Sequence, residues 1–339
     1  MSRVRRVLVA FVMVFAALPV LVGAGGDAAR SEHQRIIDFW TPERVAQAVP
    51  REIVFNVNSG RFEPAHHNPG HGGGPGGGGN GGGVTGASWT GGGTVAETTG
   101  KVLFALGSSF FVCSASLVQD SRSGESLVLT AGHCVYDNEN DRFATNWMFI
   151  PNYDAAPAPL TTSGSFCAAT LYGCWTAESL VVHTGFASEP GFTGNAILHD
   201  FAFAVLGDGG HDAGTLAESL GTQGIVFTDV SKGTPVHAFG YPHAAPYTGI
   251  DLVYCAGGVN FDNRLFRLTY KLGCNMTGGA SGGPWFQGFD EEIGRGTLIS
   301  VNSYKYSNDA NSMYGPKFNS DTQDVYNSAN SASGNTIVP

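Results

Sequence analysis

Short runs of β-branched and aromatic residues alternate with clusters of turn-forming residues from about residue 94 to the end of the chain. Long stretches with apolar residues at helical spacing are scarce in this region. Many short strands separated by turns are typical of an all-β barrel or sandwich. The strands that we expect are 102–106, 110–118, 127–130, 146–150, 180–182, 201–206, 235–239, 266–270 and 297–301.

The N-terminus has the composition of a secretory signal peptide. Three arginines within the first six residues precede the apolar run 7–22, and small residues follow it up to residue 26. A membrane anchor is the alternative, although this run is short for a membrane span. We expect a signal peptide over 1–24 and therefore a secreted protein.

Two further segments precede the β-rich region. Residues 25–67 are of mixed composition and are expected to be a pro-segment with short helices, one at 31–40 and one that Thr41 caps. Residues 68–94 are dominated by glycine, which gives too little apolar surface to offset the entropy of ordering, so we expect a flexible linker.

The charge balance excludes several kinds of partner. Of the 339 residues only 14% are charged, the formal net charge is −10, and no basic block follows the first six residues. Nucleic acids and anionic membranes attract basic surfaces, so neither is an expected partner. No later segment is long and apolar enough to span a bilayer.

Six cysteines are compatible with an oxidising compartment. Their order along the chain favours three local disulfides, and a zinc site is disfavoured because no regular Cys/His spacing occurs. The expected pairs are Cys113–Cys134, Cys167–Cys174 and Cys255–Cys274.

Two further groups of potential metal ligands are expected to be solvated. The histidines near the glycine-rich tract are His66, His67 and His71. The acidic loop at 137–141 contains Asp137, Glu139 and Asp141, and calcium binding is an alternative to a solvated loop there.

One segment carries the elements of a nucleophilic site. In TGGASGGPWF, residues 277–286, Ser281 stands among glycines. A serine becomes a good nucleophile when a base takes its proton and fixed donors hold the resulting oxyanion. Gly279 and Gly282 permit a tight turn that aims the N–H groups of Gly279 and Ser281 at one point. By itself this segment fits an ordinary loop equally well.

A second segment supports the catalytic interpretation. In SLVLTAGHCV, residues 126–135, an apolar strand ends in a histidine beside a cysteine. The two segments together, in this order, resemble the chymotrypsin-like (trypsin-fold) serine proteases. This resemblance implies that His133 is the general base and Ser281 the nucleophile. It also implies two six-stranded antiparallel β-barrels over 95–330, with the active site in the cleft between them.

A third catalytic residue is expected between these motifs, because an acidic group fixes the tautomer of the histidine. Asp200 precedes the apolar run FAFAVL, which draws its carboxylate toward the core, where a buried charge needs a partner. We therefore predict Asp200, with a surface turn as the alternative. The aspartates in loop contexts that rank below it are Asp208, Asp212, Asp229 and Asp251.

Further stretches resemble a secreted bacterial branch of this family, close to the V8-like glutamyl endopeptidases. The resemblance places Asn302, Ser303 and Tyr304 on the strand that lines the primary substrate pocket. The branch usually carries a histidine where Asn302 stands, so acidic preference is uncertain. Trypsin-like relatives hold basic side chains with an aspartate six residues before the nucleophile, where this chain has Asn275, so we expect no strong Lys/Arg preference.

A second departure concerns activation. Ala280 precedes the nucleophile, whereas digestive-type relatives have an aspartate that pairs with a new N-terminal amine. Control of this zymogen must therefore act in another way.

The predicted function is a serine-type endopeptidase that acts on peptides or proteins as a monomer, without a cofactor. The main alternative is a catalytically silent protease-fold protein that binds peptides or surfaces. An α/β-hydrolase esterase is excluded because no histidine follows Ser281, and a metalloprotease is disfavoured because no HExxH motif occurs.

Overall fold

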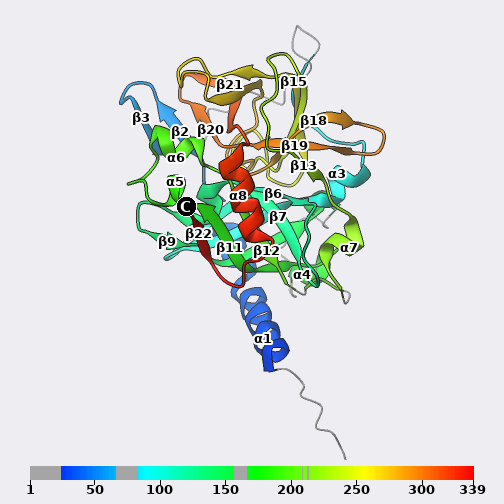
Figure 1. The fold of residues 1–339 in the computed structure, drawn as a ribbon. Helices are drawn as coiled ribbons and strands as arrows, with labels where there is room; N and C mark the ends of the chain where they lie inside the picture. The colour runs from blue at the N-terminus through cyan, green and yellow to red at the C-terminus, as the bar shows by residue number, and fades with distance from the viewer. Residues whose placement is uncertain (1–23, 66–82, 156–165, 208, 212–213) are drawn as a thin grey trace, which may run out of the picture.

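The computed structural model describes residues 24–65, 83–155, 166–207, 209–211 and 214–339. Figure 1 shows two β-rich halves packed against each other, with helix α1 (Ala24–Phe39) extending away from the first half. The predicted signal peptide up to residue 23 lies outside the described residues, as do the three histidines near the glycine-rich tract. Among the described helices, none is both long enough and apolar enough to cross a membrane.

The first half is a closed six-stranded antiparallel barrel, as the resemblance implied. Its strands are largely apolar and buried, and Leu103, Leu129 and Phe203, for example, have no solvent exposure. In order around the barrel the strands are β5 (Thr99–Leu106), β6 (Ser109–Val118), β7 (Ser126–Thr130), β12 (Ala202–Leu206), β11 (Trp175–His183) and β10 (Thr145–Pro151), with β10 pairing back to β5.

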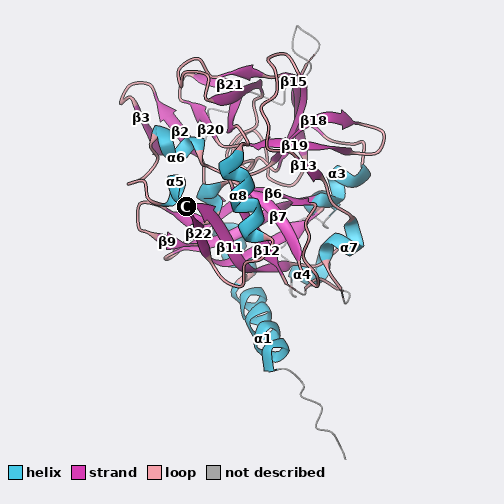
Figure 2. Cartoon of the chain, in the orientation of Figure 1, coloured by secondary structure: helices cyan, strands magenta, loops and turns pink. Residues whose placement is uncertain are grey.

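The second half consists of two six-stranded sheets that face each other (Figure 2). Their shared core includes Val236 and Ile299 from the first of these sheets and Leu272 and Met313 from the second. The first contains β13 (Gly224–Ile225), β19 (Arg295–Val301), β18 (Pro284–Asp290), β14 (Pro235–Gly240), β15 (Val253–Gly258) and β4 (Val84–Ser88); the second contains β16 (Asn260–Phe261), β17 (Thr269–Gly273), β21 (Asp309–Pro316), β20 (Tyr304–Tyr306), β2 (Ile53–Asn56) and β3 (Arg61–Pro64).

Short elements connect and cover these sheets. Strands β1 (Val49–Pro50) and β22 (Thr336–Val338) extend the first sheet in parallel pairings with β6 and β11, and β8 (Tyr136–Asp137) pairs with β9 (Arg142–Phe143). The remaining elements are α2 (Pro42–Gln47), α3 (Gly93–Thr98), α4 (Phe166–Ala169), α5 (Thr184–Ala187), α6 (Gly194–Leu198), α7 (Leu216–Leu220), α8 (Ser320–Ala329), η1 (Gly132–Cys134) and η2 (Tyr153–Ala155).

The cysteines form the three local disulfides expected from their order. Cys113–Cys134 joins β6 to the turn that carries His133, and Cys167–Cys174 closes a small loop. Cys255–Cys274 connects the two sheets of the second half, because Cys255 lies on β15 and Cys274 directly follows β17.

Two sequence-based expectations differ from the structure. Residues 84–88, expected in the flexible linker, form β4, because their Val and Thr residues pair with β15 at the edge of its sheet. The strand expected at 266–270 is wrong in its first half. Phe266 and Arg267 have φ angles of 51° and 66° in a turn, and β17 begins only at Thr269. The apolar side chain of Phe266 is 86% exposed, so hydrophobicity was a misleading guide here.

Lys101 on β5 is a charged side chain inside the protein. It is 5% exposed, and its ammonium group lies 4.0 Å from the centroid of the Tyr153 ring. Burial lowers the pKa of Lys101 to about 7 from the usual 10.5, because the charged form loses its hydration. The unfolded chain therefore holds this proton more tightly than the folded protein does.

We predict that Lys101→Met stabilises the protein more at pH 6 than at pH 10. In the wild type, stability rises with pH between the folded and unfolded pKa values of Lys101, so the advantage of the variant falls by about 1.4 kcal/mol per pH unit over that interval. Urea unfolding at several pH values measures this difference. The matched variant Lys232→Met, at an exposed position, should show no such trend. A pH-independent difference for Lys101→Met would contradict the prediction.

Candidate active site

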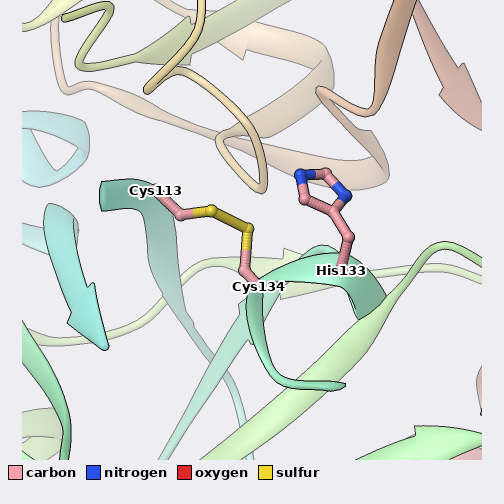
Figure 3. Close-up of side chains that lie close together, drawn as sticks. All are labelled: Cys113, His133 and Cys134. Atoms are coloured by element: carbon pink, nitrogen blue, oxygen red, sulfur yellow. A yellow bond between two sulfur atoms is a disulfide. The ribbon is translucent and has the colours of Figure 1, made fainter. Parts of the chain in front are cut away.

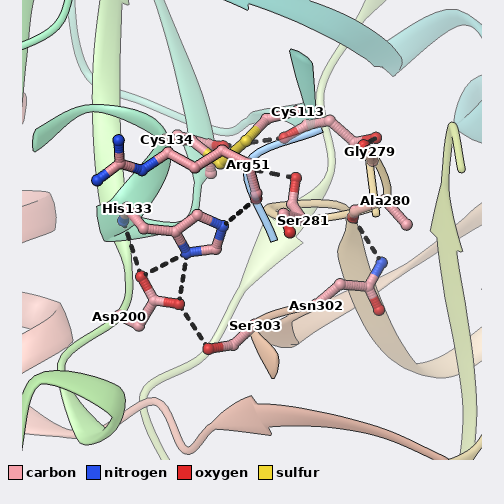
Figure 4. Close-up of a disulfide and its surroundings, with 12 residues drawn as sticks. Arg51, Cys113, His133, Cys134, Asp200, Gly279, Ala280, Ser281, Asn302 and Ser303 are labelled. Carbon is pink, nitrogen blue, oxygen red and sulfur yellow. Dashed lines mark hydrogen bonds and ion pairs between the residues drawn. A yellow bond between two sulfur atoms is a disulfide. The ribbon is translucent and has the colours of Figure 1, made fainter. Parts of the chain in front are cut away.

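The first part of the site is a pair formed by His133 and Asp200. His133 lies in η1, just after β7, and Asp200 lies two residues before β12, the neighbour of β7 in the barrel. His133 Nδ1 lies 2.8 Å from Oδ2 and 3.0 Å from Oδ1 of Asp200, and the backbone N–H of His133 donates to Oδ1 at 2.8 Å (Figure 4). The barrel register thus brings together the histidine and the aspartate that the sequence singled out.

Asp200 is fully buried, so its carboxylate depends on protein donors. Besides both N–H groups of His133, it accepts a 2.5 Å hydrogen bond from Ser303 Oγ in the second half of the molecule. Gly132 leaves room for this arrangement, because a Cβ at that position would lie 3.2 Å from Asp200 Oδ1. The carboxylate therefore orients the imidazole and links the two halves.

Ser281 lies in the loop between β17 and β18, which packs against the first barrel. The backbone N–H of Ser114 donates to the carbonyl of Ser281 at 2.7 Å. Gly282 has φ +80°, and a Cβ there would lie 2.2 Å from Thr130 Oγ1, so only glycine allows this close approach. Figure 4 shows Ser281 beyond the Nε2 edge of the His133 ring, the edge opposite Asp200.

Hydrogen bonds to its carbonyl groups fix the backbone around Ser281. Ser114 Oγ donates to the carbonyl of Gly279 at 2.9 Å, and the N–H of His243 donates to the carbonyl of Gly278 at 2.7 Å. Gly279 adopts φ +101°. Within the described part of the chain, no hydrogen bond engages the N–H groups of Gly279 and Ser281. These two donors remain available to a ligand.

Asn302, predicted to line the substrate pocket, has its side-chain amide committed to the protein. Its Nδ2 donates to the carbonyls of Phe239 and Ala280 at 2.8 and 3.0 Å, and its Oδ1 accepts from Trp285 Nε1 at 2.7 Å. Asn302 is fully buried. Its observed contacts hold the backbone directly before Ser281.

Tyr304 and Asn275, also predicted at the pocket, make internal contacts as well. The Tyr304 hydroxyl donates to Asp262 at 2.7 Å, and Asn275 Oδ1 accepts from the Tyr247 hydroxyl at 2.5 Å. Burial, together with the charge of Asp262, raises the pKa of Tyr304 well above its usual value.

Several solved structures resemble this protein, whereas no protein-family model and no curated protein matches it. Protease Anisep from Arthrobacter nicotinovorans is 35% identical, with 70% of this chain and 96% of that chain covered and a TM-score of 0.58. The thermostable serine protease AL20 from an extremophilic microorganism is 36% identical, with 70% and 99% covered and a TM-score of 0.59. A Glu endopeptidase, 17% identical with 68% and 90% covered and a TM-score of 0.50, shares the fold.

The chain belongs to the chymotrypsin-like serine proteases. It is a serine-type endopeptidase by this relationship. Ala280 directly precedes Ser281 in this protease, where digestive-type relatives have an aspartate. Ala280 packs tightly against Gly240, because a Cβ on Gly240 would lie 3.0 Å from the Cβ of Ala280.

Two groups of potential metal ligands occur among the described residues of the protease. One is His133 with Cys113 and Cys134, but both sulfur atoms belong to a disulfide and offer no thiolate (Figure 3). The other is His183, His199 and Asp321. Nδ1 of His183 accepts the N–H of Gly185 at 2.9 Å, so its neutral ring keeps the proton on Nε2 and has no second lone pair for a metal.

In the acidic loop that was considered as a calcium site, Asp137 and Asp141 bind neighbouring side chains. Asp137 accepts hydrogen bonds from Arg142 and Asn140, and Arg51 lies 3.7 Å away. Asp141 accepts a hydrogen bond from the Tyr136 hydroxyl.

Sequence reasoning missed two contributors to the site. Ser114, which accepts from the N–H of Tyr241 and donates to Gly279, follows a cysteine in an ordinary strand and carries no recognisable motif. Arg51 of the predicted pro-segment places its backbone carbonyl 3.0 Å from His133 Nε2. A backbone contact from a distant segment leaves no trace in residue types.

We predict that Asn302→Ala lowers the free energy of unfolding by about 3 kcal/mol, because it leaves buried carbonyl and indole groups without partners. Urea denaturation measures the loss. The exposed control Asn260→Ala should change stability by less than about 0.5 kcal/mol. Equal effects of the two substitutions would show that the Asn302 network contributes nothing.

Proposed function

We propose that this chain is a secreted endopeptidase that cleaves peptide bonds through a Ser281–His133–Asp200 triad and an acyl-enzyme intermediate. The observation that carries the proposal is the buried His133–Asp200 pair, with Ser281 beyond the opposite edge of the imidazole. A serine nucleophile needs a base that is itself oriented by a third group, and this arrangement offers both.

In the proposed reaction His133 Nε2 takes the proton of Ser281 Oγ as the oxygen attacks a peptide carbonyl. The same nitrogen then donates that proton to the leaving amine. In the second half of the reaction a water molecule, activated by His133 in the same way, hydrolyses the acyl-enzyme. Asp200 stays ionised and stabilises the imidazolium. The N–H groups of Gly279 and Ser281 hold the oxyanion, and each such donor typically contributes about 10²–10³ in rate.

The remaining predicted residues take supporting roles in this proposal. Ser303 positions Asp200 through its hydroxyl, and Asn302 fixes the backbone of Ala280 next to the nucleophile. Tyr304 and Asn275 belong to the walls of the substrate pocket, with side-chain oxygens already held by Asp262 and Tyr247. Substrate therefore meets backbone and ring surfaces more than free polar groups.

Export fits this activity. Three disulfides are stable in an oxidising compartment, and the basic and apolar start of the chain has the composition of a signal peptide over 1–24. We propose that the protease acts outside the cell, as a monomer, on peptides or proteins.

We predict that Ser281→Ala lowers kcat by about 10⁴-fold or more while leaving the fold intact, because no other hydroxyl can form the acyl-enzyme. Hydrolysis of a peptide substrate and labelling by a fluorophosphonate measure the loss. The exposed control Ser331→Ala should retain both activities. Turnover that survives in Ser281→Ala, with contamination excluded, rules out Ser281 as the nucleophile.

We also predict no strong cleavage after Lys or Arg, because Asn275 is neutral and its oxygen is held by Tyr247. A mixed peptide library analysed by mass spectrometry measures the preference. Asn275→Asp should increase cleavage after basic residues, since it introduces a buried negative charge that favours a cationic side chain. A wild-type profile dominated by Lys and Arg would contradict this assignment.

A further inference from the structure

The predicted pro-segment packs into the protease instead of lying apart from it. Strand β1 pairs in parallel with β6 of the first half, and the N–H of Arg51 donates to the carbonyl of Val112 at 3.3 Å. A few residues later β2 pairs in parallel with β20 of the second half, where the N–H of Ser307 donates to Phe55. Residues 49–56 thus cross from one half to the other at the site.

At the crossing point this segment contacts His133 directly. The carbonyl of Arg51 accepts from His133 Nε2 at 3.0 Å, while Nδ1 faces Asp200 (Figure 4). A carbonyl oxygen only accepts hydrogen bonds, so Nε2 is the donor in this contact. The Arg51 carbonyl therefore occupies the position at Nε2 from which a general base takes the proton of its nucleophile.

The orientation of Arg51 is also wrong for cleavage. A peptide bond about to be cut presents its nitrogen to the histidine and its carbonyl oxygen to the oxyanion donors. Arg51 presents its carbonyl oxygen to His133 Nε2 instead. The segment therefore occupies the cleft without being positioned as a substrate.

The side chains of Arg51 and Ile53 anchor the segment. The Arg51 guanidinium lies 5.4 and 5.7 Å from the centroids of the Phe111 and Phe192 rings and 3.7 Å from Asp137. Ile53 is completely buried. Together these contacts hold Arg51 at the histidine.

The loop of the proposed nucleophile also receives the segment closely. A Cβ on Gly278 would lie 2.8 Å from both Pro50 Cβ and Glu52 Oε2, so glycine is needed here for the fit. Burial lowers the pKa of Lys305 to about 8, and the negative charge of the Glu52 carboxylate offsets part of this lowering. Lys305 stands opposite Val54 in the β2–β20 pairing.

We propose that residues 49–64 are an autoinhibitory segment of three short strands, β1 to β3, that blocks His133 and the cleft until it is displaced. This inference rests on the proposed triad. It also supplies a control for a protease in which Ala280 replaces the acidic residue of digestive-type zymogens.

The test compares the intact full-length chain with its Ile53→Asp variant. A carboxylate at this buried position strongly disfavours docking of β2, so the rate of fluorophosphonate labelling at Ser281 should rise about tenfold or more. Labelling is measured by mass spectrometry on intact chains, so that processed molecules do not contribute. The control Asn58→Ala, in the exposed turn between β2 and β3, should label at the wild-type rate.

A second measurement works in trans. A synthetic peptide of residues 48–65, added to Ile53→Asp, should restore slow labelling in a dose-dependent manner and be recovered uncut, whereas a scrambled peptide should have no effect. Equal labelling of wild type and Ile53→Asp, or rapid cleavage of the peptide at Arg51, would overturn the inference. If neither chain labels at Ser281, the proposed nucleophile fails, and the inhibition that depends on it fails with it.

Discussion

The buried carboxylate of Asp200 is the interaction on which the arrangement of the site depends. It receives two hydrogen-bond donors from His133 in the first half and one from Ser303 in the second. A charge without access to water is stable only when such donors are in place. The two β-rich halves must therefore pack in one relative position to satisfy it, and that position also brings the Ser281 loop against β6.

The catalytic candidates could be predicted because their chemistry leaves local patterns. The glycine-rich turn around Ser281 and the His-Cys turn together resemble the motifs of the family and so indicated Ser281 and His133, and the apolar strand after Asp200 indicated that its carboxylate is drawn inward. The all-β architecture followed from short alternating runs. These features depend on neighbours in sequence, so they can be predicted from the order of residue types.

What the sequence could not provide depends on contacts between distant segments. The side chain of Ser303 was expected at the substrate but points to Asp200, and the amide of Asn302 donates to the carbonyls of Phe239 on β14 and of Ala280 in the loop before Ser281. Strand β4 was hidden in a glycine-rich tract, because pairing with β15 stabilises it more than its own propensity does. The docking of Arg51 at His133 is likewise a backbone contact that any residue could make.

The parallel pairings of β1 and β2 have a consequence for recognition. Each covers a strand edge, on β6 and on β20, whose N–H and C=O groups would otherwise face the cleft unpaired. When the covering strands leave, two main-chain templates become open on either side of His133. A polypeptide that replaces them is bound first through its own amide groups, which are the same at every position. Extended or unfolded chains can supply such groups in a row, whereas folded proteins have already used theirs internally.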